Sequence, residues 1–389
     1  MVLLINDDLL YYRMIITVFF TMILGIITGI FTGLIPGVHI NLISVIVLSF
    51  VSALSRWFSL VEISVFILSM SITHTFIDSI PSIYLGAPDE SQVLLALPGH
   101  KYLLDGNGHG AVKLTVIGSF FTLILSFFLF WLFSFFFKHL YDAIKNFTGI
   151  ILIMIIIGMF ILQKNPSKML KSLFVFLFSG SYGLIILNLD GLDQPLFHLL
   201  SGLFGTSLLV MSIFENSNIP AQKDSKLELD KNVATKSVLG ASIAGFFSAF
   251  LPGFGASQAA ILATQVLRNI GDAGFLILTG GLNTASMLIS ICSFFMLDKA
   301  RNGSILAIRE LLEHLDFSNL MIFLMVVVIS GSVASILALK ISKIFSSFIS
   351  RLNYRLVVLF VILFIMSLSF IFDGVLGLLI LLFASMLGI

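Results

Sequence analysis

Long apolar runs, separated by short polar stretches, follow one another along the whole chain. A bilayer with a hydrocarbon core about 30 Å thick is crossed by helices of about 20 such residues. The runs are continuous and do not alternate, which argues against an outer-membrane barrel. The pattern predicts an all-α polytopic membrane protein with segments near 14–35, 38–54, 60–77, 112–137, 148–162, 172–187, 195–214, 238–251, 256–268, 274–297, 320–340, 355–371 and 374–389.

Two of these apolar regions are interrupted by a Pro-Gly pair. The first pair stands in FTGLIPGVHINLIS (31–44), the second in SAFLPGFGASQAAILA (248–263), and the flanking segments are short for a full span. Pro cannot donate a backbone hydrogen bond, and Gly leaves the backbone open. Exposed backbone at membrane depth is tolerated only where it is buried in protein or lines a wet cavity. We therefore expect Pro-Gly-broken helices with re-entrant segments.

A helix that restarts after such a break directs free N–H groups and its positive dipole end into the cavity, which suits an anionic group. Polar residues follow both pairs, so the two breaks together predict one anion site. Its predicted substrate-binding residues are Pro36, Gly37, His39, Asn41, Pro252, Gly253, Gly255, Ser257 and Gln258. The alternative is a pair of simple kinks, because Pro and Gly are common in membrane helices.

The two breaks also open a weak internal repeat. In each half a segment rich in small and polar residues follows (71–82 and 280–290), and then an Asn-Gly turn (105–114 and 299–308). An extra span between the halves would turn the second one over, giving the inverted-topology repeats of many secondary transporters. The alternative is that two apolar halves merely look alike. The predicted units are a first membrane repeat (1–194), a linker helix with a cytoplasmic polar loop (195–237) and a second, inverted repeat (238–389).

Charge supports this reading and sets the orientation. Only 11% of the 389 residues are charged and 58% are hydrophobic, and the net charge of +1 indicates no nucleic-acid partner. Cytoplasmic loops are enriched in Lys and Arg. Twelve such residues lie in loops 98–111, 163–171, 215–237 and 340–355, against six in the N-terminal 13 residues and loops 138–147, 188–194 and 298–318. We therefore place the first set of loops in the cytoplasm.

Ionisable residues inside apolar segments mark candidate ion pathways, because they are costly in a bilayer. His74 and Asp78 are four residues apart, so they share one helix face. With Asp89, and with Asn283 and Thr284 of the second half, they form the predicted ion-coupling set. The alternatives are an interfacial His-Asp pair, a solvated turn at Asp89, and helix packing by the small polar residues.

The remaining candidates carry less chemistry. His100 and His109 stand in a turn-rich stretch and are read as loop residues, and His139, His198 and His314 as residues at span ends. The lone Cys292 excludes an internal disulfide and a Cys-based metal cluster. No pattern indicates a nucleophile with its base, so we expect no enzyme. We also expect no metal site and no cofactor other than Na⁺ or H⁺ as the coupling ion.

Three stretches together resemble a known family. GLIPGVHINLIS, YLGAPDESQVLLALPGHKYLLDGNGHGAVKLTVIGS (84–119) and FLPGFGASQAAILATQVLR (250–268) look like the large permease of tripartite tricarboxylate transporters, in its shorter, archaeal-type branch. The resemblance implies a cation-coupled carrier of carboxylates built from two inverted repeats. It also implies two partners, a small membrane subunit and an extracytoplasmic binding protein.

These observations predict a multi-pass protein of the cell membrane. It would be a permease that moves a small organic anion, a carboxylate, by symport with a cation through alternating access. One alternative is a carrier of a polyprenyl phosphate, which the same helix ends would suit. Another is a membrane scaffold that transports nothing.

Overall fold

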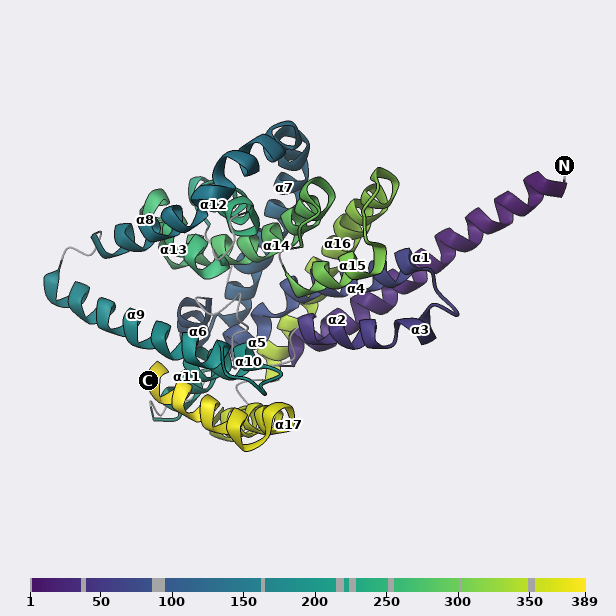
Figure 1. Cartoon of the computed structure of the whole chain (residues 1–389). Coiled ribbons are helices and arrows are strands. Elements are labelled where there is room, and N and C mark those ends of the chain that lie inside the picture. Colours follow the sequence, from purple (N-terminus) through teal and green to yellow (C-terminus); the bar gives the residue numbers. More distant parts are fainter. Residues whose placement is uncertain are drawn as a thin grey trace.

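A computed structural model gives the structure of the chain. It describes residues 2–35, 40–85, 95–161, 165–214, 220–223, 229–250, 255–300, 302–348 and 354–389. Within these residues every regular element is a helix, and there is no strand. The N-terminal part of α1 extends beyond the other helices, and α17 lies along the opposite edge of the molecule (Figure 1).

The helices follow in two series. The first half contains α1 (Val2–Leu34), α2 (Ile40–Ser49), α3 (Val51–Leu54), α4 (Leu60–Ile77), α5 (Ser79–Tyr84), α6 (Ala96–Leu104), α7 (Gly108–Ile144), α8 (Thr148–Ile161) and α9 (Pro166–Leu187). A linker follows with α10 (Pro195–Leu200), a π-helical segment (Ser201–Thr206) and α11 (Ser207–Phe214). The second half contains α12 (Lys231–Phe250), α13 (Ala256–Leu267), α14 (Gly271–Leu297), α15 (Gly303–Leu312), α16 (Phe317–Phe348) and α17 (Tyr354–Gly388).

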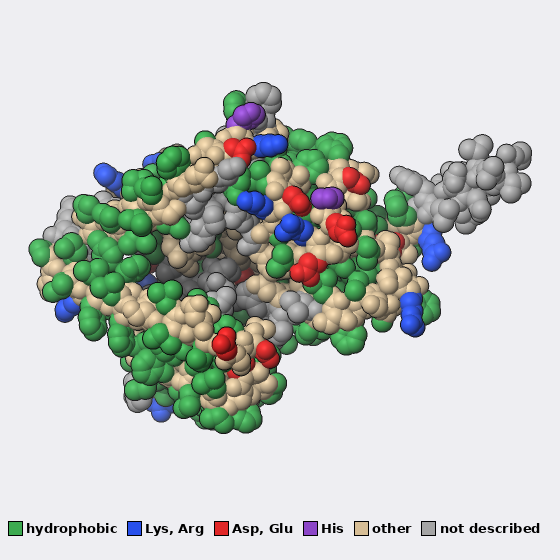
Figure 2. Space-filling view, in the orientation of Figure 1, with side chains coloured by type: hydrophobic (Ala, Val, Ile, Leu, Met, Phe, Trp, Pro, Cys, Tyr) green, Lys and Arg blue, Asp and Glu red, His purple; other side chains and the backbone are tan. Residues whose placement is uncertain are grey.

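Seven helical stretches of the described chain are long and apolar enough to cross a membrane. They are 13–34, 60–84, 108–132, 166–187, 271–297, 317–347 and 358–388. The prediction of an all-α polytopic membrane protein is thus confirmed. Hydrophobic side chains cover α8, α9 and α17, whereas charged side chains gather near α15 (Figure 2).

Local sequence explains where several helices begin. Ser59 and Glu62 form a capping box at the start of α4: the Ser59 N–H donates to Glu62 Oε2 (2.7 Å) and the Glu62 N–H to Ser59 Oγ (3.3 Å). Asn165 caps α9, with Pro166 at the first helical position, where its missing N–H costs nothing. Asn302 caps α15 by accepting from the Ile305 N–H (2.8 Å). The Asn-Gly turn of the second half therefore starts a helix.

The core is built around α4 and α14. In each of these two spans, 83% of the residues in an 18-residue stretch are buried. Helix α1 packs on α4, and α12 packs on α14. Small residues allow the close approach: a Cβ on Gly29 of α1 would lie 2.5 Å from the Met70 carbonyl oxygen of α4. Close packing through small residues is the usual way membrane helices associate.

The four central helices run in two directions. Lys101 of α6, the helix that packs on α5 at the end of α4, pairs with Asp272 at the start of α14, so α4 and α14 are antiparallel. Helix α7 starts near that same end and reaches Lys299, beyond the end of α14, through Tyr141, so α7 runs with α14. At its far end α16 contributes Ser342 to a hydrogen bond with the Tyr84 hydroxyl, so α16 runs with α4.

The two Pro-Gly regions separate helices. Helix α1 ends at Leu34 and α2 begins at Ile40; α12 ends at Phe250 and α13 begins at Ala256. Each new helix begins four residues after its Pro, although Pro36, Gly37, Pro252 and Gly253 themselves lie outside the described residues. With 10 and 12 residues, α2 and α13 are about 15 and 18 Å long, roughly half the hydrocarbon core.

The polar sequence between the halves suggests a fully solvated loop, but part of this loop is hydrogen-bonded to the first half. Gln222 Oε1 accepts the Gly108 N–H at the start of α7 (2.9 Å), and its Nε2 donates to the Leu103 carbonyl (3.0 Å). The Lys223 N–H donates to the Gly106 carbonyl (2.7 Å). One glutamine thus satisfies the orphan groups of two helix ends. It also places the connector on the same side as the 98–111 loop, as the Lys and Arg count predicts.

Candidate functional site

The site centres on Asp78, where α4 gives way to α5. Pro81 has no N–H to offer the Ile77 carbonyl, so the regular hydrogen-bond ladder is interrupted there. Asp78 caps the end of α4 and precedes α5, and it is only 2% exposed. A carboxylate at such a place is costly, which is why it marks a candidate ion pathway.

Asp78 is held across the interface between the halves. Asn283 Nδ2 of α14 donates to Asp78 Oδ2 at 3.0 Å, and Asn283 is 9% exposed. The two residues are 205 positions apart in the chain. Sequence analysis placed both in the ion-coupling set, and the structure brings them into direct contact.

Hydroxyl groups surround this pair. Thr75 Oγ1 and Thr284 Oγ1 lie 3.3 Å apart between α4 and α14, both buried. Thr115 of α7 donates to Ser79 Oγ at 3.2 Å, so a third helix contributes to the same region. We call Thr75, Asp78, Asn283 and Thr284 the midplane cluster.

The end of α1 lies against the same region. His74 Nδ1 and Thr32 Oγ1 are 3.1 Å apart, and both side chains are buried. A Cβ on Gly33 would lie 3.3 Å from the Asp78 backbone nitrogen. Helix α1 ends one residue after Gly33, so the last turn of α1 packs beside Asp78. His74 therefore lies where the end of α1 packs on α4, one turn before Asp78.

The cluster offers hard oxygen ligands. A carboxylate, an amide oxygen, hydroxyls and the carbonyls of an interrupted helix are typical ligands of small hard cations. The carboxylate could equally take up a proton. Across the described part of the chain, no three His, Cys, Asp or Glu side chains are grouped so as to hold a metal ion.

The predicted substrate residues lie in two places. Asn41 of α2 packs against Gly303 of α15, and a Cβ added to Gly303 would lie 2.7 Å from the Asn41 Oδ1. Gly255 precedes α13 as its N-cap, Ser257 is half-buried and Gln258 is exposed. Helix α2 packs on α15 and α4, whereas α13 packs on α12 and α14. The other members of the predicted sites, Pro36, Gly37, His39, Asp89, Pro252 and Gly253, fall outside the described residues.

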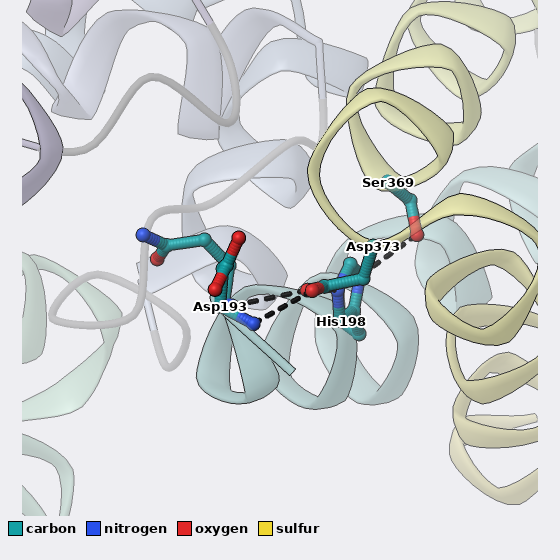
Figure 3. A network of polar contacts seen from close by, with 5 residues as sticks. Asp193, His198, Ser369 and Asp373 are labelled. Atoms are coloured by element: carbon teal, nitrogen blue, oxygen red, sulfur yellow. Dashed lines mark hydrogen bonds and ion pairs between the residues drawn. The ribbon is translucent and has the colours of Figure 1, made fainter. Parts of the chain in front are cut away.

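Sequence reasoning missed a second buried polar cluster, which forms around His198, a residue that it had placed only at a span end. His198 is fully buried, with Nε2 2.5 Å from Asp373 Oδ2 and Nδ1 2.7 Å from Ser369 Oγ (Figure 3). Asp373 also accepts the backbone N–H groups of Asp193 (2.6 Å) and Gln194 (3.0 Å). We call His198, Ser369 and Asp373 the joint cluster. All its members are buried within helix packing, so we assign it to structure rather than to reaction chemistry.

The reading of His109 as a loop residue is also wrong. It lies in the first turn of α7, is 6% exposed, and its Nδ1 is 3.0 Å from Ser342 Oγ of α16. Tyr84 of α5 reaches the same Ser342 hydroxyl at 3.2 Å. The signal in the sequence was the crowd of small residues around His109, in GNGHGA, which permits close helix packing.

A charged contact ties the two halves together at the Lys-rich end. Lys101 Nζ lies 2.6 Å from Asp272 Oδ2, with both side chains partly exposed. The hydrogen bond to Asp272 and its negative charge raise the pKa of Lys101, so this ammonium stays charged. Surface pairs of this kind add little to stability, but they fix the relative position of α6 and α14.

Comparisons with known proteins agree with this picture. The model of the tripartite tricarboxylate transporter TctA family matches residues 19–389. An uncharacterised protein of Methanocaldococcus jannaschii is 32% identical over 329 residues, which cover 82% of this chain and 79% of that protein. No solved structure matches the chain significantly.

Proposed function

Because the chain belongs to the tripartite tricarboxylate transporter TctA family, we propose that it is a membrane permease that moves a small carboxylate, driven by a cation gradient. The family prediction made from the sequence is confirmed, and with it the class of transporter component. The substrate, the coupling ion and alternating access belong to the proposal. So do the absence of enzymatic activity and the place of the protein in the cell membrane.

One observation carries the proposal: a buried carboxylate, Asp78, held by Asn283 across the interface between the two halves. A coupling ion at this place would contact both halves at once. Any relative movement of α4 and α14 would change its ligands. Ion binding could then select one conformation, as a coupled carrier requires.

We further propose that the two halves are inverted repeats. The antiparallel course of α4 and α14 supports this, as does the packing of α1 on α4 and of α12 on α14. In this arrangement the N-terminal ends of α2 and α13 would receive the substrate carboxylates. The proposed contacts are Pro36, Gly37, His39 and Asn41 from one arm, and Pro252, Gly253, Gly255, Ser257 and Gln258 from the other.

The coupling set consists of Asp78, Asn283 and Thr284, with His74 beside them. Sodium would be held by carboxylate, amide and hydroxyl oxygens, whereas a proton would be carried by Asp78 itself. In tripartite systems the permease works with a small membrane subunit and an extracytoplasmic binding protein, and we propose the same two partners here.

The test combines binding and flux. A thermal-shift screen of carboxylates, phosphates and prenyl phosphates, with and without sodium, identifies the substrate class. Purified protein in liposomes is then assayed for uptake of the carboxylate that binds, under a sodium or a proton gradient. A prenyl phosphate that stabilises the protein when no carboxylate does would overturn the proposal, as would undiminished flux without any cation gradient.

Asp78→Asn is the decisive variant. It keeps the shape of the side chain and removes its charge, and a neutral amide costs less in a bilayer than a carboxylate. We expect folding and the substrate-induced thermal shift to persist, while gradient-driven uptake falls to that of empty liposomes. Glu62→Gln is the matched control, because Glu62 is another buried carboxylate of α4 but bonds to Ser59 and to Thr17 of α1 at the start of the helix, away from the interface between the halves. Normal coupled flux in Asp78→Asn would exclude Asp78 as the coupling residue.

A further inference from the structure

A groove of about 480 Å³ lies between α8, α12 and α13. This is within the range of small-molecule sites. Its walls are almost wholly apolar, with Ile155, Leu239, Ile243, Leu262 and Val266 among them. Among the described residues, Lys236 is the one charged side chain that lines it. Such a lining suits a hydrocarbon with a single anionic end.

The groove faces away from the midplane cluster. Ala241 and Gly245 turn one face of α12 toward α14, where a Cβ on Gly245 would lie 2.5 Å from the Ala285 Cβ. Leu239, Ile243 and Phe247 are spaced four residues apart on the outer face and are 45%, 53% and 39% exposed. In a membrane, that exposure is to lipid. The groove thus opens on the side of α12 that faces away from α14 and the midplane cluster.

Lys236 lies at the end of the groove where a headgroup would be. It is exposed and stands early in α12, at the same end of the molecule as the Lys101–Asp272 pair and the Gln222 contact. A lysine near the end of a membrane helix can direct its ammonium to headgroup depth. Basic pockets between membrane helices on the cytoplasmic side bind anionic headgroups.

We propose that this groove binds one hydrocarbon chain of an anionic phospholipid, whose phosphate pairs with Lys236. The lipid stays in place and is not transported. It bridges α8, whose main contacts are with its chain neighbours α9 and the turn at Lys145–Phe147, with the α12–α13 pair that flanks the second Pro-Gly region. Bound lipid would therefore hold α13 against α12 while the central helices move.

The experiment uses the full-length protein, stripped of lipid in detergent. Phosphatidylglycerol and phosphatidylcholine with the same chains are titrated separately, and glycerol phosphate supplies the headgroup without a chain. Bound lipid is counted by native mass spectrometry, and stability is read as a thermal shift. We expect phosphatidylglycerol to bind more tightly than phosphatidylcholine, by about fivefold for one lysine near the surface. Glycerol phosphate alone should have no effect.

Two variants test the assignment. Lys236→Gln should abolish the preference for phosphatidylglycerol, whereas Lys231→Gln, at the same helix end but outside the groove, should retain it. Ala263→Trp fills the groove and should prevent binding of both lipids, while Leu184→Trp on the exposed face of α9 should not. Equal binding of the two lipids by the unmodified protein would mean ordinary surrounding lipid and would overturn the proposal. So would an unchanged preference in Lys236→Gln.

Discussion

At the scale of single residues, the contact between Asp78 and Asn283 shows how a costly carboxylate is kept inside a membrane protein. The amide N–H donates a charge-assisted bond, which is stronger than a bond between neutral groups. Thr75 and Thr284 add a second polar contact between the same two helices. The pair therefore contributes to the packing of the halves as well as to the proposed ion site.

Removal of the Asn283 amide donor should show how much this contact contributes to stability. In Asn283→Ala, Asp78 stays buried without that hydrogen bond, so we expect a loss of about 1.5–3 kcal/mol in the free energy of unfolding. Ser286→Ala, on the same helix and half-buried, should change it by much less. Unfolding in detergent, compared with the Asp78→Ala and double variants, measures the coupling between the two side chains. Additive effects would show that the contact contributes nothing to stability.

Sequence reasoning found part of this site because the chemistry is visible in the letters. An Asp inside an apolar run is expensive, so Asp78 stands out without any structure. The order of segments in the two halves placed Asn283 in the same ion-coupling set, but it did not predict the hydrogen bond between Asn283 and Asp78. Asp373 lies between two predicted spans and could be mistaken for a loop residue, because neither composition nor spacing shows that His198 packs against it.

At the scale of elements, the joint cluster fixes the bend of α17 against α10 and the residues before it. The backbone is non-helical at Asp373 and Gly374, and Gly374 has a φ of +60°, which favours glycine. Asp373 takes up the N–H groups of Asp193 and Gln194 before α10, so the bend is tied to the linker between the halves. The sequence pattern predicted this break as the gap between spans 355–371 and 374–389.

Loss of one partner of the joint cluster should destabilise the linker. Asp373→Asn removes the carboxylate that contacts His198 and accepts two backbone N–H groups, and the loss of hydrogen bonds to a charged group costs about 1.5–3 kcal/mol. Ser369→Ala should cost about 1 kcal/mol, the contribution of one hydrogen bond. Ser367→Ala, on the exposed face of α17, is the control and should have little effect. Hydrogen exchange of residues 374–388 and thermal unfolding in detergent measure both the local and the overall change.

Two outcomes would argue against a stabilising role of the joint cluster at the bend. If Asp373→Asn unfolds at the same temperature as the unmodified protein, the pair adds no stability. If exchange increases equally along α16 and α17, the effect is general and not confined to the bend.

Element boundaries followed the sequence where hydropathy decides them and departed from it where packing does. The span at 60–77 continues to Tyr84, because α5 extends α4 beyond the interruption at Asp78. The span at 112–137 extends to 108–144, since α7 runs past the apolar window. The π-helical turn at Ser201–Thr206 had no sequence signal, and it lies where the linker packs against α17.

At the scale of the whole molecule, α14 extends from the region of the first Asn-Gly turn to that of the second. Its 27 residues extend over about 40 Å, more than the hydrocarbon core. Lys101, close to the first turn, pairs with Asp272 at the start of α14. His314, in the region of the second turn, lies 3.8 Å from Asp298 at its end. The two turns thus lie at opposite ends of α14, as the proposed inverted repeats require.

Cysteine labelling in intact cells tests this arrangement and its orientation together. Asp105 is exposed near the first turn and the side chain of His314 is 84% exposed near the second, while the native Cys292 is fully buried and should not react. Because positive charge is biased to the cytoplasm, we expect a membrane-impermeant maleimide to label His314→Cys from outside. Asp105→Cys should react only after the membrane is permeabilised. Labelling of both from the same side would exclude inverted repeats, and exchanged accessibility would leave the repeats intact but reverse the orientation inferred from charge.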